Sequence, residues 1–148
     1  MKLVRDIMAR DITSVTEEDT LEKVAWLLTG YRFGGVPVVD AEGKVKGFIS
    51  EKDIIKSHYP FMGESGGYFV IRSFAEVSKK LDKQELHRVR EFMTSPAISV
   101  SEEDTVVETI NIMLEKGLRI LPVTRDGILI GVVGRTEICK EIFRTESD

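Results

Sequence analysis

The chain has 148 residues, of which 42% are hydrophobic and 31% are charged, and its formal net charge at pH 7 is −4. This composition is too apolar for an intrinsically disordered chain, and the apolar runs are too short to span a membrane. The acidic balance offers no electrostatic footprint for nucleic acid, and the first residues carry no secretory signal, so we expect a cytoplasmic protein.

Two copies of one sequence unit make up most of the chain. When 4–39 is aligned with 89–124, most positions keep their apolar or polar class, and 47–54 matches 131–138 after one residue is lost in a turn. Two copies are too few for a solenoid, so we expect them to pack against each other as one pseudo-symmetric domain. The predicted divisions are a first repeat at 1–57, an inserted segment at 58–88 and a second repeat at 89–148.

Each copy predicts the order strand, helix, strand, strand, helix. The apolar positions with helical spacing are Leu21, Val24, Ala25 and Leu28 in the first copy, and Val106, Ile110, Met113 and Leu114 in the second. We expect Asp19 and Asp104 to cap the starts of these helices, and Gly30 and Gly117 to end them.

Two short strands and a second helix follow in each copy. In the first copy the strands are predicted at 36–39 and 45–49, joined by a turn at 41–43, and the helix begins after Ser50; in the second copy the corresponding segments are 121–123, 128–133, 126–127 and the residues after Gly134. Each first strand carries a proline near its entrance, where a missing backbone donor is tolerated.

The inserted segment has two parts. Residues 59–68 are predicted to form an aromatic loop, and the following apolar residues have helical spacing, which predicts a helix leading into the second repeat. We interpret the apolar stripe as core packing against the pair, and the alternative is a lid over a ligand cleft.

The most tempting catalytic pattern is the G-x-S-x-G string at 63–67, with Asp82 and His87 following in the order of a hydrolase triad. Its surroundings are loop-like and lie outside the repeats, so we interpret it as a flexible glycine loop and assign no catalytic residue. His58 and His87 are the only histidines, and neither lies in a metal-ligand pattern, so no metal site is predicted. The single cysteine, Cys139, has apolar neighbours and is expected to be a buried, inert thiol.

The junction between the last strand and the last helix of each copy carries the most informative polar residues. In the first copy, Ser50 and Asp53 have the spacing of a capping box, which explains both residues structurally. A helix start with a hydroxyl and a carboxylate also offers amide donors for a phosphate and acceptors for the two hydroxyls of a ribose. The two interpretations are compatible.

The duplicated unit resembles the cystathionine β-synthase (CBS) domain, and the tandem resembles a CBS pair, or Bateman module. The resemblance rests on the order of four features: the start at 93–96, the Glu-Glu-Asp-Thr string before the first helix, the strand at 36–40 and the junction at 47–53. It covers the chain except most of the inserted segment. It implies an α/β (α+β) fold in which two βαββα repeats pack about a pseudo-twofold axis and form two clefts. In many members these clefts bind AMP, ADP, ATP or S-adenosylmethionine.

The resemblance implies that one cleft holds the adenosyl ligand through Ser50 and Asp53. Asp53 would accept hydrogen bonds from the ribose hydroxyls, and Ser50 would bind a phosphate. Gly34 and Gly35 would let a phosphate approach the backbone, because they have no side chains. The base would be enclosed by residues of the second copy, namely Thr94, Pro96, Ile98, Leu118, Arg119 and Ile120.

The other cleft departs from the family pattern. Gly134 stands in place of the hydroxyl and Glu137 in place of the ribose aspartate, and Arg135 would compensate with a charge-assisted phosphate contact. The base would lie against Ala9, Asp11, Thr13, Phe33 and Gly34. Because Asp11 would place a negative charge near a nucleotide, we expect this cleft to be the weaker one.

The sequence therefore predicts a non-catalytic regulatory or sensor module that requires no cofactor and binds an adenine nucleotide or S-adenosylmethionine. The family also implies a homodimer and a protein partner regulated in trans. The alternative is a ligand-free module for dimerisation or partner docking, because nothing else in the 148 residues remains to be regulated.

Overall fold

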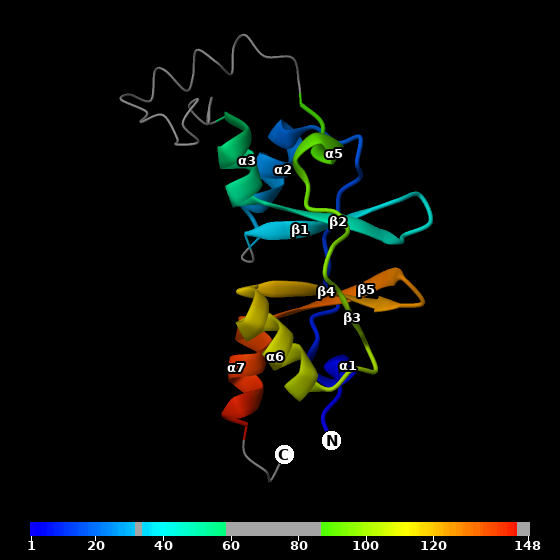
Figure 1. Ribbon diagram of the computed structural model, residues 1–148, viewed down its shortest axis with the longest axis vertical. Coiled ribbons are helices and arrows are strands. Elements are labelled where there is room, and N and C mark those ends of the chain that lie inside the picture. Colours follow the sequence, from blue (N-terminus) through cyan, green and yellow to red (C-terminus); the bar gives the residue numbers. More distant parts are fainter. Residues whose placement is uncertain (32–33, 59–86, 145–148) are drawn as a thin grey trace, which may run out of the picture.

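Two stacked lobes form the part of the chain that the computed structural model describes, which is residues 1–31, 34–58 and 87–144. Each lobe is a small sheet with helices on the side away from the other lobe, so the two sheets face each other at the middle of the molecule (Figure 1). The G-x-S-x-G string, Asp82, Phe33 and the predicted loop and helix of the inserted segment lie outside the described residues.

The first lobe contains an antiparallel pair of strands and two helices. Its elements are α2 (Leu21–Leu28), β1 (Gly35–Val39), β2 (Val45–Ser50) and α3 (Glu51–His58). The predicted first strand is reduced to one residue, Val15, which forms an isolated parallel bridge with Val38. The buried core gathers Val15, the inner side of α2 and the alternate strand positions Val36, Val38 and Ile49.

The second lobe repeats this plan with a first strand of two residues. Its elements are β3 (Val100–Ser101), α6 (Val106–Lys116), β4 (Ile120–Arg125), β5 (Ile128–Gly134) and α7 (Arg135–Ile142). The strand order is β3-β4-β5, with β3 parallel to β4 and β5 antiparallel to it. The mixed α+β fold and the βαββα order of the repeat are confirmed. None of the described helices is long and apolar enough to cross a membrane.

A single-turn helix opens each repeat, and the two are exchanged between the lobes. They are α1 (Val4–Ile7) and α5 (Val89–Phe92). The Val4 amide donates to the Asp104 carbonyl in the second lobe at 2.8 Å, and the Val89 amide donates to the Asp19 carbonyl in the first lobe at 2.8 Å. Both valines are fully buried in the core of the lobe that they join, where each contributes roughly 1.5–3 kcal/mol. Each core is therefore completed by the start of the other repeat.

Glycine makes this exchange possible where the chain crosses between the lobes. A Cβ on Gly47 would lie 2.6 Å from the Thr94 carbonyl oxygen, and a Cβ on Gly131 would lie 2.7 Å from the Ala9 carbonyl oxygen. The crossing segments are hydrogen-bonded there, since the Thr94 amide donates to the Phe48 carbonyl at 2.9 Å. Any side chain at either glycine would push the crossing segment off the strand.

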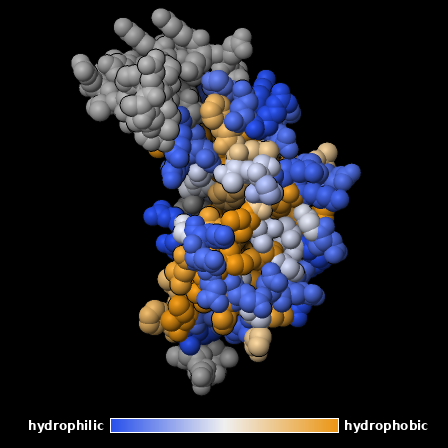
Figure 2. All heavy atoms as spheres, viewed as in Figure 1, coloured by the Kyte–Doolittle hydropathy of each residue, from blue (hydrophilic) through white to orange (hydrophobic). Residues whose placement is uncertain are grey.

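The two hairpin turns join the lobes at one end of the sheets. The Val45 amide donates to the Gly127 carbonyl at 3.1 Å, and the Leu129 amide donates to the Gly43 carbonyl at 3.0 Å. At the opposite end, on the left of Figure 1, β1 and β4 begin, and β2 and β5 lead into α3 and α7. Figure 2 shows the outline hollowed between the lobes on that side. The lobes are thus hydrogen-bonded to each other at the hairpins and separated where β2 and β5 lead into α3 and α7.

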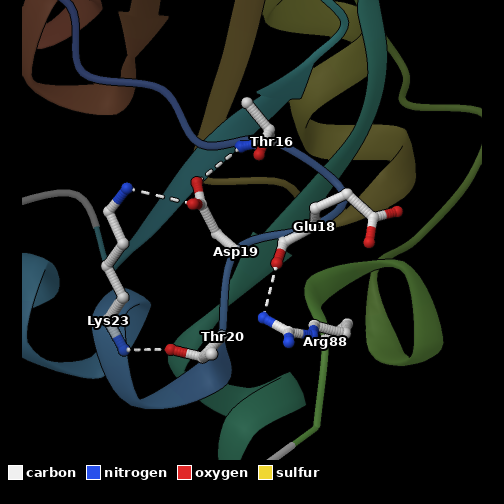
Figure 3. Close-up of polar contacts among 6 residues, drawn as sticks. All are labelled: Thr16, Glu18, Asp19, Thr20, Lys23 and Arg88. Carbon is white, nitrogen blue, oxygen red and sulfur yellow. Dashed lines mark hydrogen bonds and ion pairs between the residues drawn. The ribbon is translucent and has the colours of Figure 1, made fainter.

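The helix caps lie one residue later than the sequence predicts. Thr20 and Thr105 cap α2 and α6, each accepting from the amide three residues on, Lys23 or Glu108, at 3.1 Å. Asp19 instead closes the preceding turn by accepting from the Thr16 amide at 2.8 Å (Figure 3). Aspartate and threonine are both good caps, so adjacent positions compete and the prediction for Asp19 and Asp104 was wrong.

The helix ends and outer faces also differ in part from prediction. Gly117 ends α6 with φ of 67°, as expected, but α2 ends at Thr29 in a right-handed conformation before Gly30. Cys139, predicted to be buried, is exposed because Ile138, one position earlier, faces the core and each step turns 100° around a helix. Ala25 and Leu114 are exposed for the same reason, beside the buried Val24 and Met113.

Candidate functional site

The junction between β2 and α3 in the first lobe forms a closed polar loop. The Ser50 amide and hydroxyl both donate to Asp53 Oδ2, at 2.9 and 3.0 Å, and the Asp53 amide donates back to Ser50 Oγ at 3.3 Å. The predicted capping box is confirmed. Both residues are half-buried, and Asp53 Oδ1 accepts no hydrogen bond from the residues that the structure describes. The capping box thus leaves one carboxylate oxygen available to a further donor.

The start of β1 packs directly against this junction. Gly34 has φ of +72°, and its carbonyl accepts from the Glu51 amide at 2.9 Å. A Cβ on Gly34 would lie 2.7 Å from Glu51 Oε1, so the Glu51 carboxylate rests against the Gly34 backbone. Gly35 is buried, and the space of its missing side chain is filled by the Phe48 ring. Packing within the lobe is therefore sufficient reason for both glycines.

The equivalent junction of the second lobe has the same backbone and different side chains. The Arg135 amide donates to the Arg119 carbonyl at 3.0 Å, which reproduces the bond from Glu51 to Gly34. Glu137 is 8% exposed and accepts from the Gly134 amide at 2.9 Å, so it caps α7 from a buried position. Arg135 Nε donates to the Leu118 carbonyl at 3.0 Å, which fixes the guanidinium beside the start of β4.

The residues predicted to enclose the base fall into two groups. Thr94 is bonded through its amide and its carbonyl to Phe48, on the strand that leads to Ser50. Pro96 and Ile98 lie on the exposed stretch between α5 and β3. Leu118 and Arg119 directly precede β4, beside Arg135, and Ile120 is its first residue, with Ile120 buried and Arg119 exposed.

The residues predicted for the weaker cleft are only partly described. Ala9 is bonded to Val132 on β5, at 2.8 Å through its amide and 2.9 Å through its carbonyl. Asp11 is exposed and Thr13 half-buried on the crossing segment that follows. Phe33 lies outside the described residues.

A buried carboxylate paired with an arginine lies away from the junctions, in the second lobe. Glu102 is buried and makes a two-point contact with the Arg125 guanidinium, and the hydrogen bond from Arg125 lowers the pKa of Glu102. Backbone hydrogen bonds likewise lower the pKa of Asp40 and of Glu91, from the amides of Lys44 and Arg88 respectively. These carboxylates hold turns and helix starts.

The junctions present polar and charged groups that can bind a partner. Within 1–31, 34–58 and 87–144, no three or more His, Cys, Asp or Glu side chains are grouped so as to hold a metal ion. The first junction presents a hydrogen-bonded carboxylate, and the second presents a guanidinium held by a carbonyl. The first suits sugar hydroxyls, and the second suits an anion.

Sequence reasoning missed the position of Glu51 and the roles of Gly47 and Gly131. The two glycines occupy equivalent places in the repeat, so their recurrence was a usable signal for a close backbone approach. Glu51 gave no such signal, because the direction of an exposed side chain at a helix start is set by its neighbours in space.

The family comparison identifies CBS domains at residues 4–59 and 89–144. A CBS domain-containing protein of Dictyostelium discoideum is 27% identical over 138 residues, which cover 92% of this chain and 88% of that protein. An uncharacterized protein of Methanocaldococcus jannaschii is 29% identical over 140 residues, which cover 94% of this chain and 31% of that longer protein.

Solved structures of CBS pairs share the fold. The CBS-pair protein CBSX2 from Arabidopsis thaliana gives a TM-score of 0.80 at 22% identity, covering 99% of this chain and 98% of that one. CBSX2 in complex with AMP gives 0.74 at 22% identity, covering 96% of each chain. The CBS domain pair of protein MJ0100, in complex with 5′-methylthioadenosine and S-adenosyl-L-methionine, gives 0.70 at 21% identity, covering 96% of each chain. At these identities the likeness is one of fold.

Proposed function

Because the chain belongs to the CBS domain family, we propose that it is a regulatory module that binds an adenosine-containing ligand between its lobes and performs no chemistry of its own. The observation that carries this proposal is the first junction, where Ser50 holds Asp53 by one carboxylate oxygen and leaves the other available. CBS pairs of the same fold bind AMP, or 5′-methylthioadenosine and S-adenosyl-L-methionine, which supports the ligand class.

Asp53 is the proposed ribose anchor. Two neighbouring hydroxyls can donate to one carboxylate, and hydrogen bonds to a charged group contribute about 1.5–3 kcal/mol each. Half-burial strengthens them, because fewer water molecules compete. The base would lie against Ile98 and Ile120, with backbone groups around Leu118 and Arg119 at its polar edge. Thr94 and Pro96 would close the other side.

The ligand would act by bridging the lobes. The hairpins already fasten one end of the interface, so a molecule that contacts α3 of one lobe and β4 of the other would fix the opposite end. Such a ligand shifts the lobe arrangement only in proportion to its different affinity for the two arrangements. A partner protein, acting in trans, would read that arrangement. The cytoplasmic location expected from the sequence stays a prediction.

A thermal-shift and calorimetry screen of the purified chain tests the proposal. The ligands are AMP, ADP, ATP, 5′-methylthioadenosine and S-adenosylmethionine, with guanosine and GMP as controls for the base. A ligand present at a hundred times its dissociation constant adds about 2.7 kcal/mol to stability and moves the melt visibly. A rise with an adenosyl compound and none with its guanosine counterpart supports the proposal. Flat melts and no heat with all five would contradict it.

The second candidate function is assembly without a ligand, and one observation favours it. Large apolar side chains stand exposed on the outer helices: Trp26 on α2 is 71% exposed, and Val107 and Leu114 on α6 are 65% and 71% exposed. Exposed apolar groups on helix faces mark association surfaces when they gather. We propose that a second copy covers them in a homodimer. Sedimentation at several concentrations measures the mass, and a constant dimer with nucleotide-insensitive melting favours this function over the sensor.

A further inference from the structure

The first junction contains groups that a helix start uses to hold a phosphate, and four of its donors are already engaged: the amides of Ser50, Glu51 and Asp53 and the Ser50 hydroxyl. The first amide of α3, on Glu51, donates to the Gly34 carbonyl at 2.9 Å. The Ser50 hydroxyl donates its hydrogen to Asp53 at 3.0 Å, and the Ser50 amide donates to the same oxygen at 2.9 Å. A phosphate that used the Ser50 hydroxyl or the amides of Ser50 and Asp53 would have to break the capping box.

Glu51 adds a charge of the wrong sign for a phosphate. Its Oε1 atom lies where a Gly34 side chain would begin, 2.7 Å from the Cβ position. The glycine backbone expected to receive a phosphate is therefore covered by a carboxylate. Lys52 follows on the same turn and is exposed, but the side chain that faces Gly34 is that of Glu51. Two anions a few ångström apart repel, more strongly near protein than in bulk water.

The second lobe carries the opposite charge at the equivalent helix start. Its first helical residue is Arg135, whose amide makes the equivalent bond to the Arg119 carbonyl at 3.0 Å and whose Nε is held by the Leu118 carbonyl at 3.0 Å. The second helix start therefore carries a positive side chain at the sequence position where the first carries the negative Glu51. One fold therefore carries both signs at equivalent helix starts.

We infer that Glu51 is a specificity-determining residue that makes the first junction prefer an adenosyl ligand with a neutral or cationic 5′ substituent, a thioether or a sulfonium, over a 5′-phosphorylated nucleotide. This inference rests on the proposed function, since it assumes that the ribose binds Asp53. The inference concerns only which adenosyl ligand is preferred. The chain can therefore bind adenosyl ligands as proposed even if Glu51 does not discriminate at the 5′ position.

Calorimetry with two matched probes tests the inference. 5′-Methylthioadenosine and AMP share the base and the ribose and differ at the 5′ position. We expect the unmodified chain to bind methylthioadenosine about tenfold more tightly than AMP. In Glu51→Arg, which copies Arg135, AMP should gain about tenfold while methylthioadenosine changes by less than about threefold, and Glu51→Gln should fall between them. The AMP gain should shrink at high salt.

Glu22→Arg is the matched control, because Glu22 is an exposed acid in the first turn of α2 in the same lobe. It makes the same charge change away from the junction and should leave both affinities unchanged. AMP binding the unmodified chain as tightly as methylthioadenosine, or a ratio that Glu51→Arg does not alter, overturns the inference while the adenosyl function stands. If neither probe binds any variant, the proposed function fails and the inference falls with it.

Discussion

The two strand-to-helix junctions share a backbone and differ in chemistry. In both, the first helical amide donates to a carbonyl at the start of the neighbouring strand, at 2.9 Å from Glu51 and 3.0 Å from Arg135. The side chains of the first junction are a hydroxyl, an acid and a half-buried aspartate, and those of the second are a hydrogen atom, a guanidinium and a buried glutamate. The duplication has kept the frame while the groups that would meet a ligand have diverged.

The largest expected effect tests whether the close approach of a crossing segment to a strand glycine is equally important for stability in both lobes. Gly47→Ala and Gly131→Ala each place a Cβ within 2.7 Å of a backbone carbonyl oxygen on a crossing segment. Backbone cannot yield as a side-chain tip does, so we expect each to lower the free energy of unfolding by about 1–3 kcal/mol. Denaturant titration measures this.

Gly30→Ala is the control for these two variants, since a Cβ there meets nothing within 4 Å. It should leave stability unchanged or raise it slightly. Equal losses at Gly47 and Gly131 would confirm that the crossings are equivalent. A stable Gly47→Ala beside an unstable Gly131→Ala would show that the symmetry is one of sequence only.

The next effect separates Asp53, a cap that is also the proposed ligand anchor, from Glu137, which is a cap alone. Asp53→Ala should weaken adenosyl-ligand binding by about tenfold or more, since a charged hydrogen-bond acceptor worth about 1.5–3 kcal/mol is lost. Glu137→Ala removes the equivalent acid, which is buried and accepts from Gly134, so it should lower stability and leave the affinity of the first junction unchanged. Calorimetry and melting of both variants give the two readings. A loss of affinity in Glu137→Ala alone would move the site to the other lobe.

The third effect concerns the helix caps, where the lobes should agree. Thr20→Ala and Thr105→Ala each remove a hydroxyl that accepts a helix amide at 3.1 Å. We expect each to cost about 1 kcal/mol, the usual value for a cap. Thr20→Ser retains the acceptor and should recover most of the loss. Asp19→Ala tests the alternative cap, and a larger loss there than in Thr20→Ala, with no recovery in Thr20→Ser, would reverse the assignment.

Much of the frame was readable from the repeat. Its register predicted the hairpin turns, the paired strands and the two helices of each copy, because apolar spacing and turn residues act locally. The capping box of Ser50 and Asp53 was predictable for the same reason, since its partners are three residues apart. Matching positions in the two copies reinforced the signals for strands, turns and helices, although the matching acids Asp19 and Asp104 are not the helix caps.

The exchange of α1 and α5 was not predictable from local signals. A four-residue helix with one buried valine gives the same pattern whichever core receives it, and only the fold places Val4 beside Asp104. The exposure of Cys139 depends on one step around α7, which its apolar neighbours in sequence do not reveal. The direction of Glu51 likewise follows from the approach of Gly34, a contact between segments that meet only after folding.

The smallest expected effect uses a difference between the lobes in their response to acid. In the second lobe the hydrogen bond from Arg125 lowers the pKa of Glu102 below its ordinary value of 4.5. The position of Arg125 is taken in the first lobe by Asp40, which is held by the amides of Glu42 and Lys44. A carboxylate whose pKa is lowered by folding stabilises the fold above its ordinary pKa, and the contribution disappears as the pH falls through the lowered value.

Arg125→Met should therefore be less stable than the unmodified chain at pH 7, and the difference should shrink as the pH drops below 4.5. Melting temperatures measured between neutral and acid pH give the two curves, with Lys46→Met as the control that removes an exposed partner of Asp40. Curves that stay the same distance apart at every pH would show that Arg125 stabilises by packing alone, and that the buried carboxylate of the second lobe contributes nothing through its charge.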